Sequence, residues 1–223
     1  MGFWWHNPGM LELGVKVLMA YLLGSLLGSL ILGRLRGVDI RSLGSGNAGA
    51  TNALRTQGKA FGLVVLLIDA GKGVLGVLLL PAAALPAVPI DPELSREWLT
   101  SACGLAVILG HVYPVWFAFR GGKGVATLIG VIGAMQPRLL LPVLGSWFIV
   151  VLLTGYVSLA SMLAGAILVL AAYLTEPGNL PLLVFCFGAE LLVIYTHRGN
   201  IARLLAGKEN RARRLWLFRS RAA

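Results

Sequence analysis

A series of long apolar runs constrains this chain more than any other feature, because most of them approach the roughly 20 residues that cross a bilayer as a helix. The runs cover residues 14–35, 61–80, 99–119, 125–135, 139–153, 157–174 and 180–195. Only helices and closed barrels satisfy their backbone groups in lipid, and runs of this length indicate helices. They leave no room for a separate soluble domain. We therefore predict one all-α polytopic membrane domain over residues 1–223, with about seven transmembrane helices.

Two of these runs are short for a full span. Runs 125–135 and 139–153 are separated by Gln136-Pro137, where proline removes an amide donor and disfavours helix at the residue before it. They are expected to form tilted or half-length helices, or one broken pair.

Basic residues gather on one side of the predicted topology. With seven spans, loops 34–60 and 120–124, the turn near 154–157 and the tail after His197 share a face that carries 15 of the 19 Lys and Arg residues. The positive-inside rule then places the N-terminus outside and the tail in the cytoplasm. The net charge of +10 is thus mainly a topology signal, with attraction to anionic lipid headgroups as a second effect. Nucleic acid is a poor partner, because no soluble reading module is present.

The first polar segment, residues 43–55, cannot be explained by apolar burial. Glycines alternate there with short hydrogen-bonding side chains, in the order Ser45, Gly46, Asn47, Gly49, Thr51 and Asn52. Glycine allows backbone N–H groups to fold around an anion, and Arg55 adds a forked cation one turn later. An anion site and a plain polar turn between two helices are the two interpretations.

The second polar segment, residues 119–127, has glycines and Lys123 directly before an apolar run. Glycines that lead into a helix start present unpaired N–H groups and the positive end of the helix dipole, which suits a phosphate. The spacing of Gly122, Lys123 and Gly124 does not match a Walker loop, so an NTPase is excluded. A short basic cytoplasmic turn is the alternative.

The third polar segment, residues 197–209, follows the last apolar run. If it is helical, His197, Asn200 and Arg203 share one face, and three polar donors there favour an anionic ligand. A basic amphipathic tail, as Arg211 and Trp216 suggest, is the alternative.

Charged residues also lie inside two of the apolar runs. Asp69 and Lys72 are three positions apart and so share a helix face, either as a structural ion pair or with Lys72 as a ligand contact. His111, close to Pro114, is expected to be a hydrogen-bonded structural residue.

The three polar segments, in this order and at these intervals, resemble the bacterial acyl-phosphate-dependent glycerol-3-phosphate acyltransferase family (PlsY type). Asp69 with Lys72-Gly73, and Gly110-His111 with Pro114, also resemble its pattern, over essentially the whole chain. The resemblance implies transfer of a fatty acyl group from acyl phosphate to the sn-1 hydroxyl of glycerol 3-phosphate. It also implies an active site on the cytoplasmic face of the bacterial inner membrane.

The resemblance further implies roles for individual residues. The phosphate of acyl phosphate would be held by Ser45, Gly46, Asn47, Gly49, Thr51, Asn52 and Lys72. Glycerol 3-phosphate would be held by Arg55, Gly122, Lys123, Gly124, His197, Asn200 and Arg203. Catalysis would involve His197, Asn200, Ser45 and Arg55, with Asp69, His111, Ser161 and Glu209 in support. The proton acceptor would be His197 or the phosphate of the bound substrate.

The chemistry of the reaction fits this residue set. Acyl phosphate is a mixed anhydride, so the enzyme needs orientation and charge stabilisation and no covalent nucleophile. No Gly-x-Ser-x-Gly motif is present, and no His is followed five residues later by Asp. We expect no metal, no cofactor and a monomer surrounded by membrane lipids. A secondary transporter for a phosphorylated or carboxylated solute is the rival function, and a lipid-binding scaffold is a third. The loop at residues 81–98 has no place in the family pattern.

Overall fold

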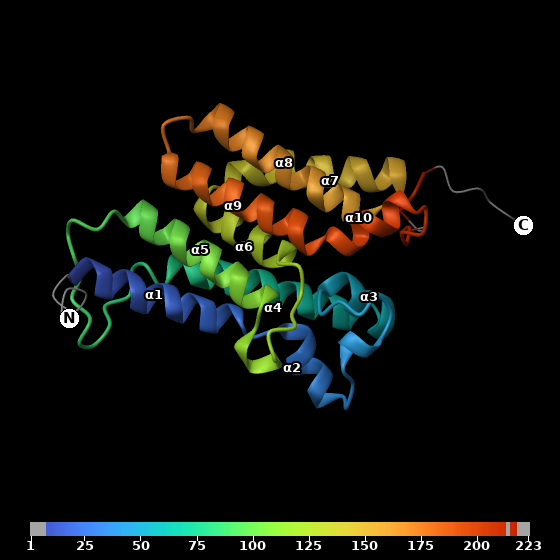
Figure 1. Cartoon of the computed structure of the whole chain (residues 1–223), viewed down its shortest axis with the longest axis horizontal. Helices are drawn as coiled ribbons and strands as arrows, with labels where there is room; N and C mark the ends of the chain where they lie inside the picture. The colour runs from blue at the N-terminus through green and yellow to red at the C-terminus, as the bar shows by residue number, and fades with distance from the viewer. Residues whose placement is uncertain (1–7, 213–214, 218–223) are drawn as a thin grey trace, which may run out of the picture. The chain divides into compact units, whose positions relative to one another are not determined.

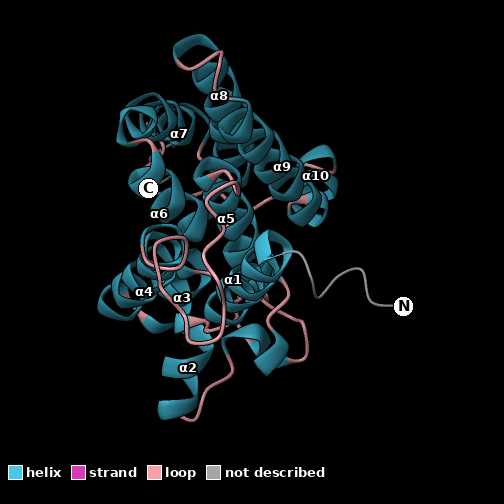
Figure 2. Ribbon diagram, turned by 90° about the vertical axis from the view of Figure 1, so that its left-hand side faces the viewer, coloured by secondary structure: helices cyan, strands magenta, loops and turns pink. Residues whose placement is uncertain are grey.

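The computed structural model describes residues 8–212 and 215–217, and every regular element within them is a helix (Figure 2). The predicted all-α fold is therefore confirmed. The chain divides into two compact units, the first ending at Met135 and the second beginning at Gln136. Four of the basic tail residues used in the topology prediction, Arg213, Arg214, Arg219 and Arg221, lie outside the described residues.

The first unit is built around α1, α4 and α5, which lie side by side in Figure 1. Small residues allow these helices to approach closely: a Cβ on Gly24 of α1 would collide with the carbonyl oxygen of Val107 in α5. In the same way, Gly130 of α6 lies against the carbonyl oxygen of Ala70 in α4. The elements of this unit are α1 (Pro8–Gly24), α2 (Gly28–Leu35), η1 (Ile40–Ser42), α3 (Ala50–Gln57), α4 (Lys59–Leu78), α5 (Arg96–Val112), η2 (Val115–Phe117) and α6 (Val125–Met135).

In the second unit, α8 packs between α7 and α9. Asn179 begins α9 by accepting a hydrogen bond from the amide of Leu182 at 3.0 Å, as expected of an N-cap residue. The chain bends by 55° between α9 and α10. The elements of this unit are η3 (Pro137–Leu139), α7 (Leu140–Thr154), α8 (Val157–Thr175), α9 (Leu180–Thr196) and α10 (Arg198–Leu205).

Not every apolar helix is long enough to be a full span. By length and composition, four helices in the described part of the chain could cross a membrane, or up to six if each bent pair is one span. The remaining predicted run, 125–135, forms α6 and is short as expected: its 11 residues, at 1.5 Å per residue, reach only about half of the hydrocarbon core. The run at 139–153, by contrast, joins η3 to give a span from Pro137 to Thr154.

The first apolar run is also not continuous, since α1 and α2 meet at a 44° bend. The ammonium of Lys72 donates to the carbonyl oxygens of Gly24 at 2.7 Å and Leu26 at 3.0 Å, which the break would otherwise leave without partners. The amide of Gly28 donates to Asp69 at 3.3 Å. Charges on α4 thus stabilise the break in its neighbour, a contact that local hydropathy cannot predict.

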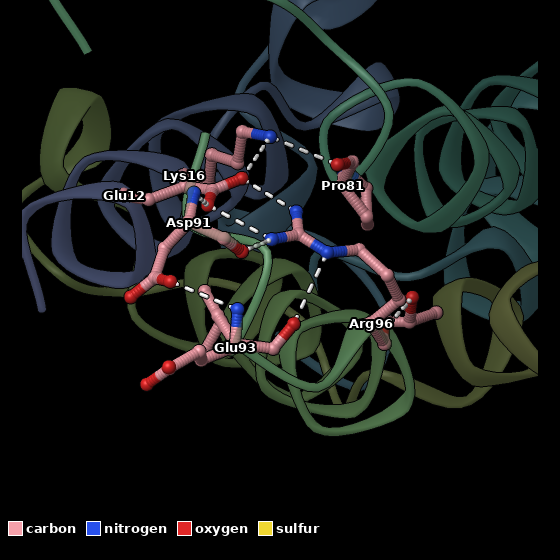
Figure 3. Close-up of polar contacts among 8 residues, drawn as sticks. Glu12, Lys16, Pro81, Asp91, Glu93 and Arg96 are labelled. Carbon is pink, nitrogen blue, oxygen red and sulfur yellow. Dashed lines mark hydrogen bonds and ion pairs between the residues drawn. The ribbon is translucent and has the colours of Figure 1, made fainter. Parts of the chain in front are cut away.

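A buried carboxylate fastens the loop at residues 81–95 onto α1 (Figure 3). Glu12 has no exposed surface and accepts from Lys16 at 2.8 Å, from both terminal nitrogens of Arg96 at 2.5 and 2.9 Å, and from the amide of Asp91 at 2.9 Å. Lys16 also donates to the carbonyl oxygen of Pro81 at 2.8 Å. One buried acid therefore pairs with two basic residues, Lys16 and Arg96.

Candidate functional site

The first and second polar segments meet at one end of the first unit. The first segment lies between α2 and α4, and the second connects the C-terminal end of α5 with the start of α6. Leu27, Leu30, Ala48 and Phe117 form a small buried cluster beneath them. In addition, the hydroxyl of Ser29 in α2 donates to the carbonyl oxygen of Ala48 at 2.6 Å.

Arg41, two residues before the first segment, bonds to the start of the second. One terminal nitrogen of its guanidinium donates to the carbonyl oxygens of Phe117 at 3.1 Å and Arg120 at 3.2 Å. The other lies 2.8 Å from Asp39, and hydrogen bonds from Arg41 hold the pKa of that carboxyl below its ordinary value. In the sequence, Arg41 was only one of the basic residues of loop 34–60 that predict the topology. The Asp39-x-Arg41 spacing was the one available sign that the guanidinium is held in a fixed direction.

Asn52 gives the first segment its shape. Its amide nitrogen donates to the carbonyl oxygens of Ile40, Leu43 and Asn47 at 3.1, 2.9 and 3.0 Å, and its oxygen accepts from the amide of Ser45 at 2.9 Å. The side chain is buried, and both its nitrogen and its oxygen are hydrogen-bonded to backbone groups of the protein. A direct bond to a ligand would have to replace one of these contacts.

The groups that the first segment exposes are the ones that suit an anion. Ser45, Gly46, Thr51 and Arg55 are exposed, while Asn47 and Gly49 are partly buried. Gly46 has a φ of +73°, in the left-handed region that glycine favours. Helix α3 starts after Gly49 with no side-chain cap, so no side chain occupies the positive end of its dipole. Thr51 and Arg55 are four residues apart and share a face of α3.

The second segment folds back onto the last turn of α5. The amides of Gly121 and Gly122 donate to the carbonyl oxygens of Val112 and His111, both at 3.1 Å. A Cβ on Gly122 would collide with the imidazole Nε2 of His111, so only glycine fits there. Gly124 has a φ of +84° directly before α6. Lys123, partly exposed, therefore sits at a helix start on a rigid turn.

The charges inside the first unit act on the protein itself. Asp69 lies 3.2 Å from Lys72 and 3.5 Å from His111, and all three side chains are at most 4% exposed. Since Lys72 also bonds two backbone carbonyls, the geometry favours the structural alternative for this residue. His111 is likewise enclosed, and its carbonyl oxygen accepts from the amide of Gly122 in the second segment.

The third polar segment belongs to the second unit. His197 is 3% exposed and stands at the bend between α9 and α10, with its Nδ1 2.8 Å from the carbonyl oxygen of Val193. A carbonyl only accepts, so Nδ1 carries the hydrogen, and in the neutral ring Nε2 is the basic nitrogen. The backbone amide of Asn200 donates to the carbonyl oxygen of His197 at 2.8 Å, in the first turn of α10.

Glu209 organises the third segment. Its carboxylate accepts from Asn200 at 2.5 Å, from Ser158 at 2.8 Å and from Arg203 at 2.8 Å. Burial opposes the charged form, but these three hydrogen bonds outweigh it and lower the pKa of Glu209. Its cationic partner is Arg203.

Ser158 was missed by sequence reasoning. Its neighbour one turn later, Ser161, was predicted to be a supporting residue and bonds the carbonyl oxygen of Val157 at 2.9 Å and the indole of Trp147 at 3.3 Å. The only local sign for Ser158 was a hydroxyl in the first turn of an otherwise apolar helix.

The structure thus brings the first two segments together within one unit and gives the third an ordered network in the other. Convergence of all three stays a prediction. In residues 8–212 and 215–217, no three His, Cys, Asp or Glu side chains are arranged to hold a metal ion.

Comparison with known proteins gives consistent matches over nearly the whole chain. The sequence model of glycerol-3-phosphate acyltransferase matches residues 15–207. A glycerol-3-phosphate acyltransferase from Aquifex aeolicus is 42% identical over 196 residues, covering 87% of this chain and 96% of the relative. One from Nostoc is 42% identical over 219 residues, covering 94% and 93%.

A solved structure has a similar fold. The crystal structure of PlsY (YgiH), an integral membrane glycerol 3-phosphate acyltransferase, in its glycerol 3-phosphate form, superimposes with a TM-score of 0.77 at 40% identity. The match covers 89% of this chain and 94% of that one. The lysophosphatidic acid form gives a TM-score of 0.74 at 38% identity.

Proposed function

Because the chain belongs to the glycerol-3-phosphate acyltransferase family, we propose that it transfers a fatty acyl group from acyl phosphate to the sn-1 hydroxyl of glycerol 3-phosphate. The hydroxyl oxygen attacks the acyl carbon and the bond from that carbon to the phosphate oxygen breaks. Inorganic phosphate leaves with the electron pair, and the hydroxyl proton passes to a base. The products are lysophosphatidic acid and phosphate, the first step of bacterial phospholipid synthesis.

The first polar segment binds the phosphate of the donor. Its exposed hydroxyls on Ser45 and Thr51, the amides at the start of α3 and the two glycines at positions 46 and 49 support this role. Asn47 belongs to the same group, whereas Asn52 acts mainly by shaping the loop, because its side chain already bonds the carbonyls of Ile40, Leu43 and Asn47. The amides and the positive end of the α3 dipole stabilise the leaving phosphate as its charge develops.

Glycerol 3-phosphate is held by cations and amides from all three segments. Arg55 and Lys123, with Gly122 and Gly124, contribute from the first unit, and His197, Asn200 and Arg203 from the second. Lys123 at the start of α6 is a point charge suited to a phosphate. Asn200 and Arg203 are already fixed by Glu209 and would lose little freedom on binding.

His197 is the first choice for the proton acceptor. The bond from Nδ1 to Val193 leaves Nε2 as the basic nitrogen of the neutral ring. A phosphate oxygen of the bound substrate is the alternative, and it requires no protein base.

This mechanism requires the two compact units to act as one catalytic domain, residues 1–223, in the bacterial inner membrane. The three polar segments then face the cytoplasm and the N-terminus lies outside, in agreement with the positive-inside pattern. The enzyme works as a monomer among membrane lipids, which also carry its acyl product.

The observation that carries the proposal is the pair of glycine-rich loops in the first unit, with Arg41 beside the first loop bonded to the start of the second, in a chain of this family. The test is to give the purified protein acyl phosphate and glycerol 3-phosphate, without CoA or ATP. Formation of lysophosphatidic acid and an equal amount of phosphate supports the enzyme. Uptake of glycerol 3-phosphate into liposomes with no acyl transfer would instead identify the rival transporter.

A further inference from the structure

The chain continues past the family match, which ends at residue 207, and its next residues lie against the turn between α7 and α8. The amide of Ala212 donates to the carbonyl oxygen of Gly155 at 2.7 Å, and that of Leu217 to Leu152 at 3.0 Å. The indole of Trp216 donates to the carbonyl oxygen of Leu153 at 3.2 Å. Carbonyls in the last turn of a helix lack helical partners, so these bonds complete the end of α7.

Arg211 holds the same residues by stacking. Its guanidinium lies 4.7 Å from the ring centre of Tyr156 and 4.1 Å from that of Trp216. Both distances are within the range of cation–π attraction. Gly155 makes room for this contact: its φ is +76°, and a Cβ there would lie 3.2 Å from both Arg211 and Trp216.

This contact begins two residues after Glu209, whose carboxylate holds the hydrogen-bond network of the third polar segment. Glu209 is 6% exposed and reaches Ser158 in α8 as well as Asn200 and Arg203 in α10. On its N-terminal side the chain is tied by the amide of Lys208 to the carbonyl oxygen of Arg203 at 2.8 Å. On its C-terminal side Arg211 and the residues after it provide the attachment.

We propose that residues 209–212 and 215–217 form a C-terminal strap that holds Glu209 on α8 and thereby positions Asn200 and Arg203 for the acceptor phosphate. Arg211 and Trp216 are positioning residues, since they touch neither reactant and act through Glu209. The proposal rests on the proposed function, because it assigns to the strap the geometry of the glycerol 3-phosphate site.

The test compares steady-state kinetics of Arg211→Ala, Glu209→Gln and the double variant with wild type. Arg211→Ala removes two cation–π contacts and should lower kcat/KM for glycerol 3-phosphate by about 5-fold to 30-fold. The KM for acyl phosphate should not change. Because Arg211 acts only through Glu209, the double variant should be no worse than Glu209→Gln. Lys208→Ala is the matched control, as it removes a neighbouring exposed charge that makes no such stack, and it should behave as wild type.

Two conservative variants separate positioning from folding. Arg211→Lys keeps the cation and should recover part of the loss, and Trp216→Phe keeps the ring but removes the bond to Leu153. If Arg211→Ala does not fold, either of these variants takes its place in the kinetic comparison. The strap is overturned if Arg211→Ala matches Lys208→Ala, if the effects of Arg211 and Glu209 add, or if both substrates are affected equally. Absence of acyl transfer in the wild-type protein would instead refute the proposed function.

Discussion

Replacing Glu12 with Gln should destabilise the protein strongly without touching the candidate site. The carboxylate is fully buried and accepts four hydrogen bonds, three of them from Lys16 and Arg96 (Figure 3). Gln keeps the size of the side chain but removes its charge, and its amide places a donor against other donors. Lys16, at 1% exposure, then remains as an uncompensated buried cation.

The magnitude follows from the burial of the two partners. Removing one member of a buried ion pair costs about 3 to 5 kcal/mol. The lower figure applies here, because Arg96 is 42% exposed and can turn to water. For a chain of this length, about 3 kcal/mol corresponds to a fall of roughly 6 to 12 °C in the melting temperature.

The assay is thermal unfolding of the detergent-solubilised protein, with limited proteolysis of the loop at residues 81–95 as a second readout. Glu93→Gln is the control: its carboxylate is exposed, and only its backbone amide takes part in the local bonding. The control should melt within about 1 °C of wild type. If Glu12→Gln melts with the control and its loop is no more sensitive to protease, the buried carboxylate does not fasten the loop and the reasoning fails.

Three further predictions concern the candidate site. Lys123→Ala should raise the KM for glycerol 3-phosphate about tenfold or more with little change in melting temperature, because it removes a charge and no apolar packing; unchanged kinetics would reduce Lys123 to a topology charge. Asn200→Ala should lower kcat/KM more than it lowers stability, since Glu209 keeps its bonds to Ser158 and Arg203; the reverse order, measured by kinetics and melting, would indicate a structural role. The stabilisation provided by Glu209 should be complete above its ordinary pKa of 4.5 and be lost as the pH falls through its lowered folded value, so the difference in melting temperature between wild type and Glu209→Gln should shrink in acid. A difference that does not vary with pH would contradict the ionised network.

The sequence by itself determined the membrane class, the helical fold and the three polar segments. Each of these depends on local signals: the length of an apolar run, or glycines among short polar side chains where no core can form. The same signals do not show where the first apolar run breaks. The hydropathy of residues 14–35 contains nothing that marks the break at residues 25–27, which depends on Asp69 and Lys72 in another helix.

Only the tertiary structure decided which polar groups are committed to the protein itself. Arg41 reaches Arg120, Glu12 reaches Arg96, and Ser158 reaches Glu209, across 79, 84 and 51 positions of sequence respectively. In sequence, Lys72 and Asn52 look as suited to a ligand as Lys123 and Thr51 do. The difference is burial: a polar group removed from water must find its partners inside the protein, and those partners are set by packing between helices.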